Sequence, residues 1–150
     1  MSKEPILETE RLILRPITLD DAAACFSWNS DERVAKYMSY PTLTDISQTI
    51  DWIKSTLTDE KEYNFAFVLK KENKVIGTGS IGPSSKLEGY WGMGYNLHFD
   101  YWHKGYCTEA MKAIIDYVHK ELGVNRICSC HAVDTVSYTH LRAHETLANL

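Results

Sequence analysis

The sequence contains no apolar run close to the roughly 20 residues that a membrane-spanning helix needs. Its first segment, MSKEPILETE, lacks the apolar stretch of a secretory signal. Positive charge is not in excess either, because the net charge is −4 and the lysines and arginines are scattered. We therefore expect a cytoplasmic protein that binds neither a membrane nor nucleic acid.

Cysteine is scarce, and no two cysteines form a CxxC pair. The four cysteines of a cytoplasmic chain are expected to be reduced. Cys128 and Cys130 would share one face of a strand, but no matching ligand cluster accompanies them, so we expect packing instead of metal binding. His140 and His144 have the spacing of helical metal ligands and lack a third ligand. The sequence therefore predicts no metal site.

Glycine motifs of nucleotide-binding folds are also missing. Neither G-x-G-x-x-G nor G-x-x-x-x-G-K-[ST] occurs, which argues against a nucleotide-binding domain. What the chain has is 150 residues, 44% of them hydrophobic and 24% charged. That is the bulk and polarity of one globular domain with one core.

Apolar periodicity predicts a mixed α/β domain with no internal repeat. The expected strands are 11–17, 63–69, 74–81, 90–99 and 126–133, and the expected helices are 22–28, 31–38, 45–57 and 108–122. A short turn at 71–73 joins two of these strands and indicates an antiparallel hairpin. The last helix is the most regular, with one apolar stripe made of Ala110, Met111, Ile114, Ile115, Val118 and Leu122.

Capping residues mark several of the expected boundaries. Thr18, with Asp21 three residues later, is a good N-cap for the first helix, and Thr44 is a candidate for the third. Gly123 stands where a left-handed C-cap would end the last helix. In the strand 90–99, Gly92 and Gly94 suggest a bulge or the close approach of another backbone.

The segment YWHKGYCTEA, residues 101–110, joins a predicted strand to the last helix. A turn that opens a helix leaves backbone N–H groups without partners beside the positive end of the helix dipole, and so forms an anion site. Gly105, in its middle, would let an anion approach the main chain closely. An acidic protein could bind a polyanionic cofactor in this way.

Two separated motifs carry a resemblance to a known family. The chain reads ETERLILRP from Glu8 to Pro16 and WHKGYCTEA from Trp102 to Ala110. In this order, with the expected strands and helices between them, they resemble the GCN5-related N-acetyltransferase (GNAT) superfamily, and most of all the branch of the ribosomal-protein alanine acetyltransferases. The resemblance implies the acyl-CoA N-acyltransferase fold, in which a mixed, mostly antiparallel sheet is flanked by helices.

The resemblance also implies a binding site for acetyl-CoA. The family motif Q/R-x-x-G-x-G/A maps onto Trp102, Gly105 and Cys107, of which only the glycine matches literally. The implied cofactor loop consists of Trp102, His103, Lys104, Gly105, Tyr106, Cys107 and Thr108, with amides from 103–108 on the pyrophosphate and a hydroxyl from Thr108. The pantetheine arm would pair with main chain near Asn96 and Leu97, where an amide polarises the thioester carbonyl.

Several of these residues also have simpler interpretations. Trp102 and Tyr106 could pack in the core, and Lys104 could be only solvated. Glu109, in the first turn of its helix, suits the helix dipole. The candidate general base is His131, although strand alternation turns it away from Cys130, the position of a glutamate that acts as base in some relatives.

The end of the chain departs from the family pattern. Val136 to Thr146 matches the translation of a transposon-type sequencing-library adapter. We therefore expect a partial N-acetyltransferase domain at 1–135 and an artefactual tail at 136–150. In relatives the replaced segment completes one side of the cleft and often supplies the tyrosine that protonates the departing thiolate, so this chain is expected to be incomplete as an enzyme.

The sequence as a whole predicts an N-acetyltransferase. It would move an acetyl group from acetyl-CoA to a primary amine, by direct attack in a ternary complex. The acceptor would be a protein N-terminus or a small molecule. The alternative is a non-catalytic acyl-CoA-binding module, which would keep the phosphate loop and lack a working acid and base.

Overall fold

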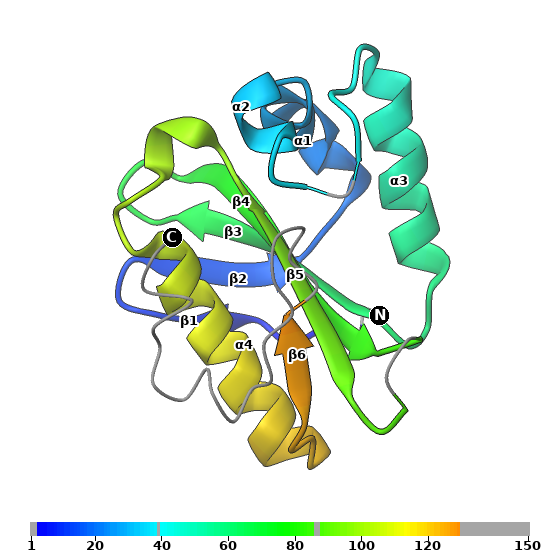
Figure 1. Ribbon diagram of the computed structural model, residues 1–150. Coiled ribbons are helices and arrows are strands. Elements are labelled where there is room, and N and C mark those ends of the chain that lie inside the picture. Colours follow the sequence, from blue (N-terminus) through cyan, green and yellow to red (C-terminus); the bar gives the residue numbers. More distant parts are fainter. Residues whose placement is uncertain (1–2, 39, 86–87, 130–150) are drawn as a thin grey trace.

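Six strands form one sheet, in the order in which they occur along the chain (Figure 1). The computed structural model describes residues 3–38, 40–85 and 88–129. The strands are β1 (Leu7–Glu8), β2 (Leu12–Pro16), β3 (Tyr63–Leu69), β4 (Lys74–Pro83), β5 (Trp91–Leu97) and β6 (Ile127–Ser129). Neighbouring strands are antiparallel except β5 and β6, which are parallel. This confirms the predicted mixed, mostly antiparallel sheet.

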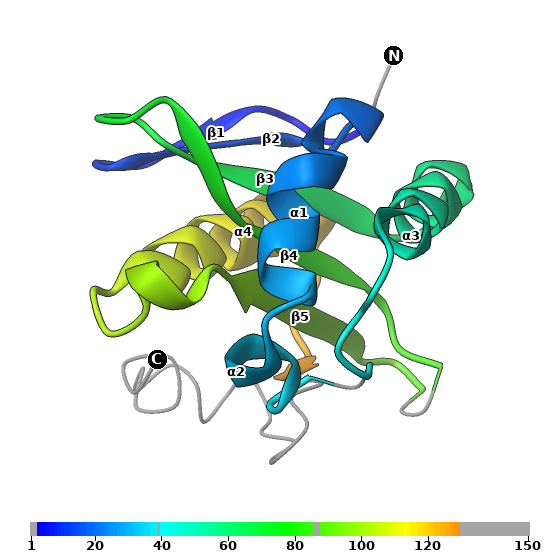
Figure 2. The ribbon, with the colours of Figure 1, turned by 90° about the horizontal axis from the view of Figure 1, so that it is seen from above.

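The helices cover both faces of this sheet (Figures 1 and 2). They are α1 (Ala22–Asn29), α2 (Glu32–Ala35), α3 (Ile46–Thr58) and α4 (Tyr106–Leu122), with the short 3-10 turns η1 (Leu19–Asp21) and η2 (Phe99–Tyr101). α4 packs on one face, and α1 and α3 lie over the other. The predicted helix over 31–38 is shorter than expected, because only the four residues of α2 are α-helical.

Two apolar clusters hold these layers together. The larger lies between the sheet and α4, where Ala110, Met111, Ile114, Ile115 and Val118 are at most 2% exposed. The smaller joins α1 and α3 through Cys25, Trp28, Val34 and Ile53. Leu122 was wrongly predicted to belong to the stripe of α4. It is 38% exposed, because it lies in the last turn, where the chain leaves the helix at Gly123.

Capping contacts explain where the helices begin. Thr18 was predicted as the N-cap of the first helix, but the N-cap of α1 is Asp21, and Thr18 with Asp21 forms the capping box of η1, which runs directly into α1. The N-cap of α3 is Asp45 and not Thr44, since the Asp45 side chain accepts a hydrogen bond from the Ser47 amide. The Gln48 side chain accepts from the Asp45 amide and completes a capping box. α4 begins at Tyr106, two residues before the predicted start, and Gly123 ends it in the left-handed conformation as expected.

The glycines of β5 do not mark a bulge. The pairing of β4 with β5 runs without a register shift from Gly77 and Leu97 to Pro83 and Trp91. The irregularity of the sheet lies instead between Phe67 and Val68 of β3. A Cβ added at Gly94 would meet only the Ser80 hydroxyl, at 3.6 Å, so the strand surface is open there.

Part of the predicted chain lies outside the described residues. This holds for Cys130, His131, the His140 and His144 pair, the domain end at 135 and the tail 136–150, so the interpretations placed on them stay predictions. β6 is described to Ser129, within the strand predicted at 126–133. Among the described helices, none combines the length and the apolar character that crossing a bilayer requires.

Candidate active site

The loop before α4 has a backbone conformation that few side chains tolerate. His103 and Gly105 both lie in the left-handed region, with φ of 62° and 81°. For His103 this conformation costs on the order of 1 kcal/mol, a strain that proteins keep mainly at functional sites. Gly105 is the N-cap of α4, and it has no side chain to accept hydrogen bonds from the amides of the first turn.

These features are typical of an anion-binding site. α4 has 17 residues, so its dipole places partial positive charge at the end where Tyr106 begins the helix. The first intrahelical bond runs from the Glu109 amide to the Gly105 carbonyl, 3.0 Å away. Amides N-terminal to Glu109 therefore point out of the helix toward the loop, as donors for an anionic ligand do.

Arg11, at the entry to β2, fixes this loop in place. Its Nε donates to Glu109 Oε1 at 2.7 Å, and its Nη1 donates to the Lys104 carbonyl at 3.0 Å. The guanidinium also stacks over the Tyr106 ring, 4.2 Å from the ring centroid. One cationic side chain thus contacts the loop, the first residue of α4 and the first-turn carboxylate.

Glu109 is the other half of this arrangement. Its Oε2 accepts from the Arg11 amide at 2.8 Å and from the Thr9 hydroxyl at 2.5 Å. The carboxylate therefore joins the first turn of α4 to a segment 98 positions earlier in the chain. From the sequence, Glu109 was interpreted first as a partner of the helix dipole and second as a contact with substrate, and its pairing with Arg11 was not predicted. Both belong to the two family-like motifs, which was the available signal for their contact.

We predict that Glu109 stabilises the fold in a pH-dependent way. Burial raises the pKa of Glu109, but the hydrogen bonds from Thr9 and Arg11 outweigh it and hold the pKa below its ordinary value. A lowered carboxyl pKa contributes stability above the unfolded pKa, about 4.3, that is lost as pH falls through the folded pKa. Glu109→Gln should therefore lower the free energy of unfolding by about 1–2 kcal/mol at neutral pH.

Thermal midpoints measured from neutral to acid pH check this prediction. The gap between wild type and Glu109→Gln should shrink as the pH drops below about 4. Glu121→Gln, an exposed carboxyl on the same helix, should show almost no gap at any pH. A gap for Glu109→Gln that widens in acid would contradict the account.

The other residues of the predicted cofactor loop are buried, exposed or half-buried in pairs. Tyr106 and Cys107 are buried in the core beneath the loop, and burial raises the pKa of the Cys107 thiol to about 12, so it stays protonated. His103 and Lys104 are exposed. Trp102 is half-buried and donates from Nε1 to the Leu97 carbonyl at 2.8 Å, which ties the loop to the end of β5. Thr108 is half-buried in the first turn of α4.

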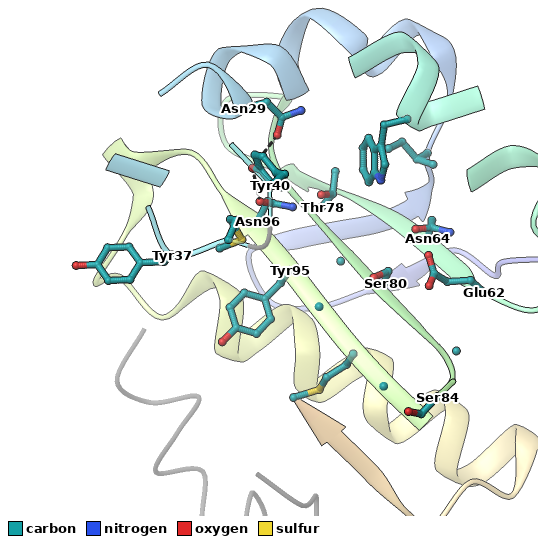
Figure 3. Close-up of a pocket in the computed structure, with 18 of the residues that line it drawn as sticks. Asn29, Tyr37, Tyr40, Glu62, Asn64, Thr78, Ser80, Ser84, Tyr95 and Asn96 are labelled. Atoms are coloured by element: carbon teal, nitrogen blue, oxygen red, sulfur yellow. Dashed lines mark hydrogen bonds between the residues drawn. The ribbon is translucent and has the colours of Figure 1, made fainter. Parts of the chain in front are cut away.

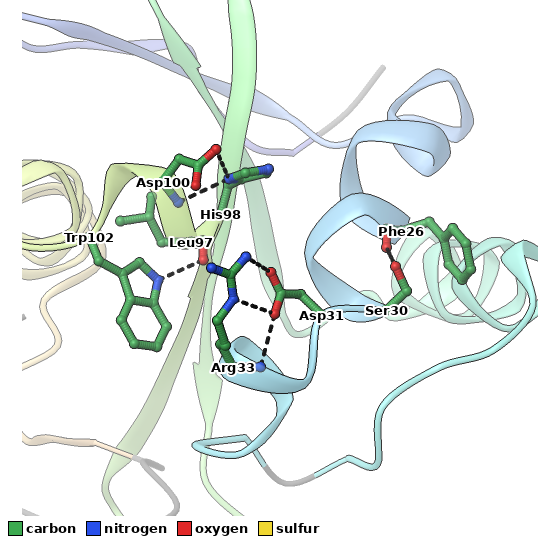
Figure 4. A network of polar contacts seen from close by, with 8 residues as sticks. All are labelled: Phe26, Ser30, Asp31, Arg33, Leu97, His98, Asp100 and Trp102. Atoms are coloured by element: carbon green, nitrogen blue, oxygen red, sulfur yellow. Dashed lines mark hydrogen bonds and ion pairs between the residues drawn. The ribbon is translucent and has the colours of Figure 1, made fainter.

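A polar network braces the chain where β5 leads into this loop (Figure 4). Arg33 of α2 forms a two-point ion pair with Asp31 and stacks over the Phe99 ring, 3.9 Å from the centroid. Hydrogen bonds from Arg33 hold the pKa of Asp31 below its ordinary value, although burial alone would raise it. The side chain of His98 accepts from the Asp100 amide at 3.1 Å. The turn η2 is therefore anchored both to α2 and to β5.

Within the described residues, the parallel pair of β5 and β6 is short, because β6 pairs only with 91–93 of β5. The His98 amide donates to the Ile76 carbonyl and the Ser84 amide to the Tyr90 carbonyl, so the even positions of β5 exchange hydrogen bonds with β4. By alternation, Asn96 points its main-chain groups toward β4, and Leu97 points its amide away from β4.

A cleft of about 480 Å³ lies on the sheet face that α1 and α3 flank (Figure 3). Its floor is formed by β4 and β5, including Gly92 and Gly94, and the floor is open at Gly94, where an added Cβ would meet only the Ser80 hydroxyl. Its polar lining consists of Asn29, Tyr40, Gln48, Glu62, Asn64, Thr78, Ser80, Ser84, Ser85 and Asn96. The described residues contain no cluster of three or more His, Cys, Asp or Glu side chains that could hold a metal ion.

Tyr40 links the wall of this cleft to its floor. Its hydroxyl lies 2.9 Å from Asn29 Oδ1 and 2.8 Å from Asn96 Oδ1 (Figure 3). Burial raises the pKa of Tyr40, so the hydroxyl keeps its proton and donates it to one of the two. Asn29 in turn donates to the Thr49 hydroxyl at 3.1 Å, which fixes its orientation. The Asn96 side chain is therefore held at the cleft, beside Leu97.

Fold and site together define a transferase of the acyl-CoA-binding class, with an anion loop on one side and a substrate-sized cleft on the other. A family model described as the acetyltransferase (GNAT) domain matches residues 11–137. The chain belongs to this family, whose members transfer acetyl groups from acetyl-CoA to amine acceptors, and it is an acetyl-CoA-dependent acetyltransferase.

Similar proteins agree with this assignment. An uncharacterized N-acetyltransferase p20 of Bacillus licheniformis is 38% identical over 124 residues, which cover 81% of this chain and 70% of the relative. The uncharacterized N-acetyltransferase YoaA of Bacillus subtilis is 31% identical over 126 residues, covering 82% and 71%. A solved GNAT-family acetyltransferase from Bacillus anthracis has a TM-score of 0.74 at 25% identity, covering 83% of this chain and 72% of that one.

One solved structure similar in fold contains CoA. It is a spermidine N-acetyltransferase from Vibrio cholerae in complex with CoA and spermine, with a TM-score of 0.68 at 14% identity, covering 79% of this chain and 70% of that one. At this identity the similarity shows a shared fold and no more.

Proposed function

We propose that this protein transfers the acetyl group of acetyl-CoA to a primary amine, with the CoA pyrophosphate bound by the amides of 103–108. The observation that carries the proposal is the Gly105 loop at the positive end of α4, braced by Arg11. The guanidinium lies beside the loop, since its Nη2 is 3.4 Å from where a Cβ of residue 105 would be. A loop built from main-chain donors, with a cation beside it, fits a diphosphate.

The pantetheine arm and thioester are proposed to lie along β5, at the end of the strand that contains Asn96 and Leu97. The strand register favours the Leu97 amide over the Asn96 amide as the donor to the thioester carbonyl, because Asn96 directs its main chain toward β4. A donor aimed at this oxygen stabilises the negative charge that grows there as the amine attacks. The Thr108 hydroxyl is proposed as an additional phosphate ligand.

The acceptor amine is proposed to bind in the cleft and to attack the thioester directly, in a ternary complex. The Tyr40 and Asn96 side chains reach the cleft next to Leu97, so the two substrates would meet at the end of β5. The amine must lose a proton to become a nucleophile. His131 remains the candidate base proposed from the sequence, and it lies outside the described residues.

Both acceptor classes predicted from the sequence, a protein N-terminus and a small amine, are carried forward as proposals. The branch of ribosomal-protein alanine acetyltransferases, which the two motifs resemble, favours the N-terminus. The size of the cleft, about 480 Å³, is compatible with either a small amine or the first residues of a peptide.

The direct test is transfer itself. The chain is mixed with acetyl-CoA and a panel of amines and N-terminal peptides, and both the released CoA thiol and the acetylated product mass are measured. The proposal expects one equivalent of acetylated amine for each thiol. A second chain, in which the residues after 135 are replaced by the corresponding segment of a relative, is tested in the same way. If both chains bind CoA and neither acetylates any amine, the result would instead support the non-catalytic acyl-CoA-binding module.

A further inference from the structure

Glu62 and Asn64 lie together at one end of the cleft, apart from Tyr40 and Asn96 (Figure 3). Glu62 directly precedes β3, and Asn64 is the second residue of that strand. Glu62 packs against Gly82 of β4, since a Cβ at Gly82 would lie 3.0 Å from the Glu62 Cα. This end of the cleft has no role in the proposed binding of acetyl-CoA. Its side chains are nevertheless arranged in an unusual way.

The amide of Asn64 is the first unusual feature. Asn64 is 3% exposed, and its Nδ2 has no hydrogen-bond partner among the described residues. A buried polar group left in this state costs about 1–3 kcal/mol, so native proteins rarely keep one without a ligand or water. A half-turn of this side-chain amide would present its oxygen to the cleft in place of its nitrogen.

The carboxyl group of Glu62 is the second unusual feature. It is half-buried and forms no ion pair within the described residues. Burial raises the pKa of Glu62 and the charge of Asp59 raises it further, while the neighbouring Asn64 side chain and the charge of Lys3 lower it only in part. A cation bound at this carboxylate would offset the loss of water and stabilise the charged form.

The surroundings favour a positive ligand. Glu4 lies close by, where its Oε2 accepts a hydrogen bond from the main-chain N–H of Asn64 at 2.9 Å. Lys3, whose charge acts on Glu62, pairs with Glu4 at 3.6 Å and donates to the Asp59 carbonyl at 3.0 Å. This end of the cleft therefore carries uncompensated negative charge, which attracts cations and repels carboxylates and phosphates.

We propose that Glu62 and Asn64 bind a second, positively charged group of the acceptor, so that the substrate is an amine carrying a distal ammonium or guanidinium. The inference rests on the proposed acetyl transfer. An ammonium has three N–H donors and no acceptor, and it would be met by the Glu62 carboxylate and, after rotation of the amide, by Asn64 Oδ1.

The geometry assigns Glu62 to specificity and not to proton transfer. Gly82, which Glu62 contacts, pairs with Gly92 of β5. From Gly92 to Leu97 the strand advances five residues, about 17 Å at the usual rise. Glu62 is therefore too far from the proposed thioester position to take the proton of the attacking amine. The distal charge belongs to a long acceptor, either a polyamine or a peptide with a basic side chain.

Two matched comparisons test the proposal on the full chain with CoA bound. Spermidine is compared with pentylamine, which has no distal charge, and an N-terminal peptide containing lysine is compared with its norleucine counterpart. Binding is measured by calorimetry with CoA bound, and KM and kcat are measured with acetyl-CoA by the release of the CoA thiol. In wild type, spermidine or the lysine peptide should bind at least tenfold more tightly than its uncharged counterpart, and the pair that shows the difference identifies the source of the charge.

Glu62→Gln should remove that difference by raising Kd and KM for the charged acceptor about tenfold, while kcat and pentylamine binding stay unchanged. Glu60→Gln removes an exposed carboxylate nearby and should behave as wild type, and thermal midpoints confirm that both variants fold. The proposal is overturned if Glu62→Gln binds the charged acceptors as wild type does, if Glu60→Gln has the same effect, or if wild type does not prefer the charge. Failure of the proposed function looks different: no amine is acetylated, while Glu62→Gln still weakens binding of the charged acceptor.

Discussion

Gly105→Val is expected to weaken CoA binding about a hundredfold, which corresponds to roughly 3 kcal/mol. Residue 105 has a φ of 81°, a conformation that a β-branched side chain adopts only with strain. A Cβ there would also lie 3.4 Å from Arg11 Nη2, so the side chain would press on the residue that braces the loop. The valine would occupy the space through which phosphates approach the amides of 103–108. Calorimetric titration with CoA measures the loss.

The matched control for this variant is Gly89→Val. Gly89 has nearly the same φ, 83°, and nothing within 4 Å of an added Cβ, so it reproduces the backbone strain away from the loop. This variant should lose a similar amount of stability and bind CoA as wild type does. Equal CoA affinities of folded wild type and Gly105→Val would refute the placement of the pyrophosphate.

Met111→Asp is expected to lower the free energy of unfolding by about 3–5 kcal/mol, a large part of the total stability of a domain of this size. Met111 is fully buried in α4, and its Sδ lies 3.0 Å from where a Cβ of Gly79 would be, so it fills the space above β4 that the glycine leaves. An aspartate there would be an unpaired charge in an apolar core. Chemical denaturation measures the loss.

Lys112→Asp provides the comparison for this second prediction. Lys112 is exposed on the next position of the same helix, so the same new side chain meets water instead of the core. We expect a change within about 1 kcal/mol. Equal midpoints for Met111→Asp and wild type would show that α4 turns a different face to the sheet.

The strands and the longer helices could be predicted from the sequence because burial on one or two faces leaves a periodic apolar pattern. The strands at 63–69 and 74–81 show this well, since β3 has the predicted bounds and β4 extends only to Pro83. Boundaries set by local hydrogen bonds were harder to predict. Thr44 and Asp45 are both good caps by type, and the hydrogen bond that the Asp45 side chain accepts from the Ser47 amide decides for Asp45.

Two predictions from the sequence failed, the bulge in β5 and the burial of Leu122, because tertiary structure decides both. A glycine in a strand signals missing side-chain volume, and the sequence does not say whether a bulge or an open cleft uses it. In β5 Gly92 and Gly94 form part of the floor of the cleft. Leu122 continues the helical period, but a period does not reveal where the packing partner ends.

The candidate site divides in the same way. The loop at Gly105 could be found because glycine, the helix start and the motif lie together in the sequence. The contact of Arg11 with Glu109 joins residues 98 positions apart, and each of them has an ordinary local interpretation. Glu62 and Asn64 belong to no motif. They differ from other polar residues only because they are buried in the cleft while the Glu62 charge and the Asn64 Nδ2 lack full polar partners there.

The central claim is that CoA binds to the loop before α4, and a titration of isotope-labelled protein with CoA, followed by the amide signals in NMR spectra, tests it most directly. The account predicts that the largest and saturable shifts belong to the amides of 103–108 and to Leu97, with smaller shifts at the Arg11 side chain. Saturable shifts centred elsewhere in the protein, with the amides of 103–108 unchanged, would contradict it.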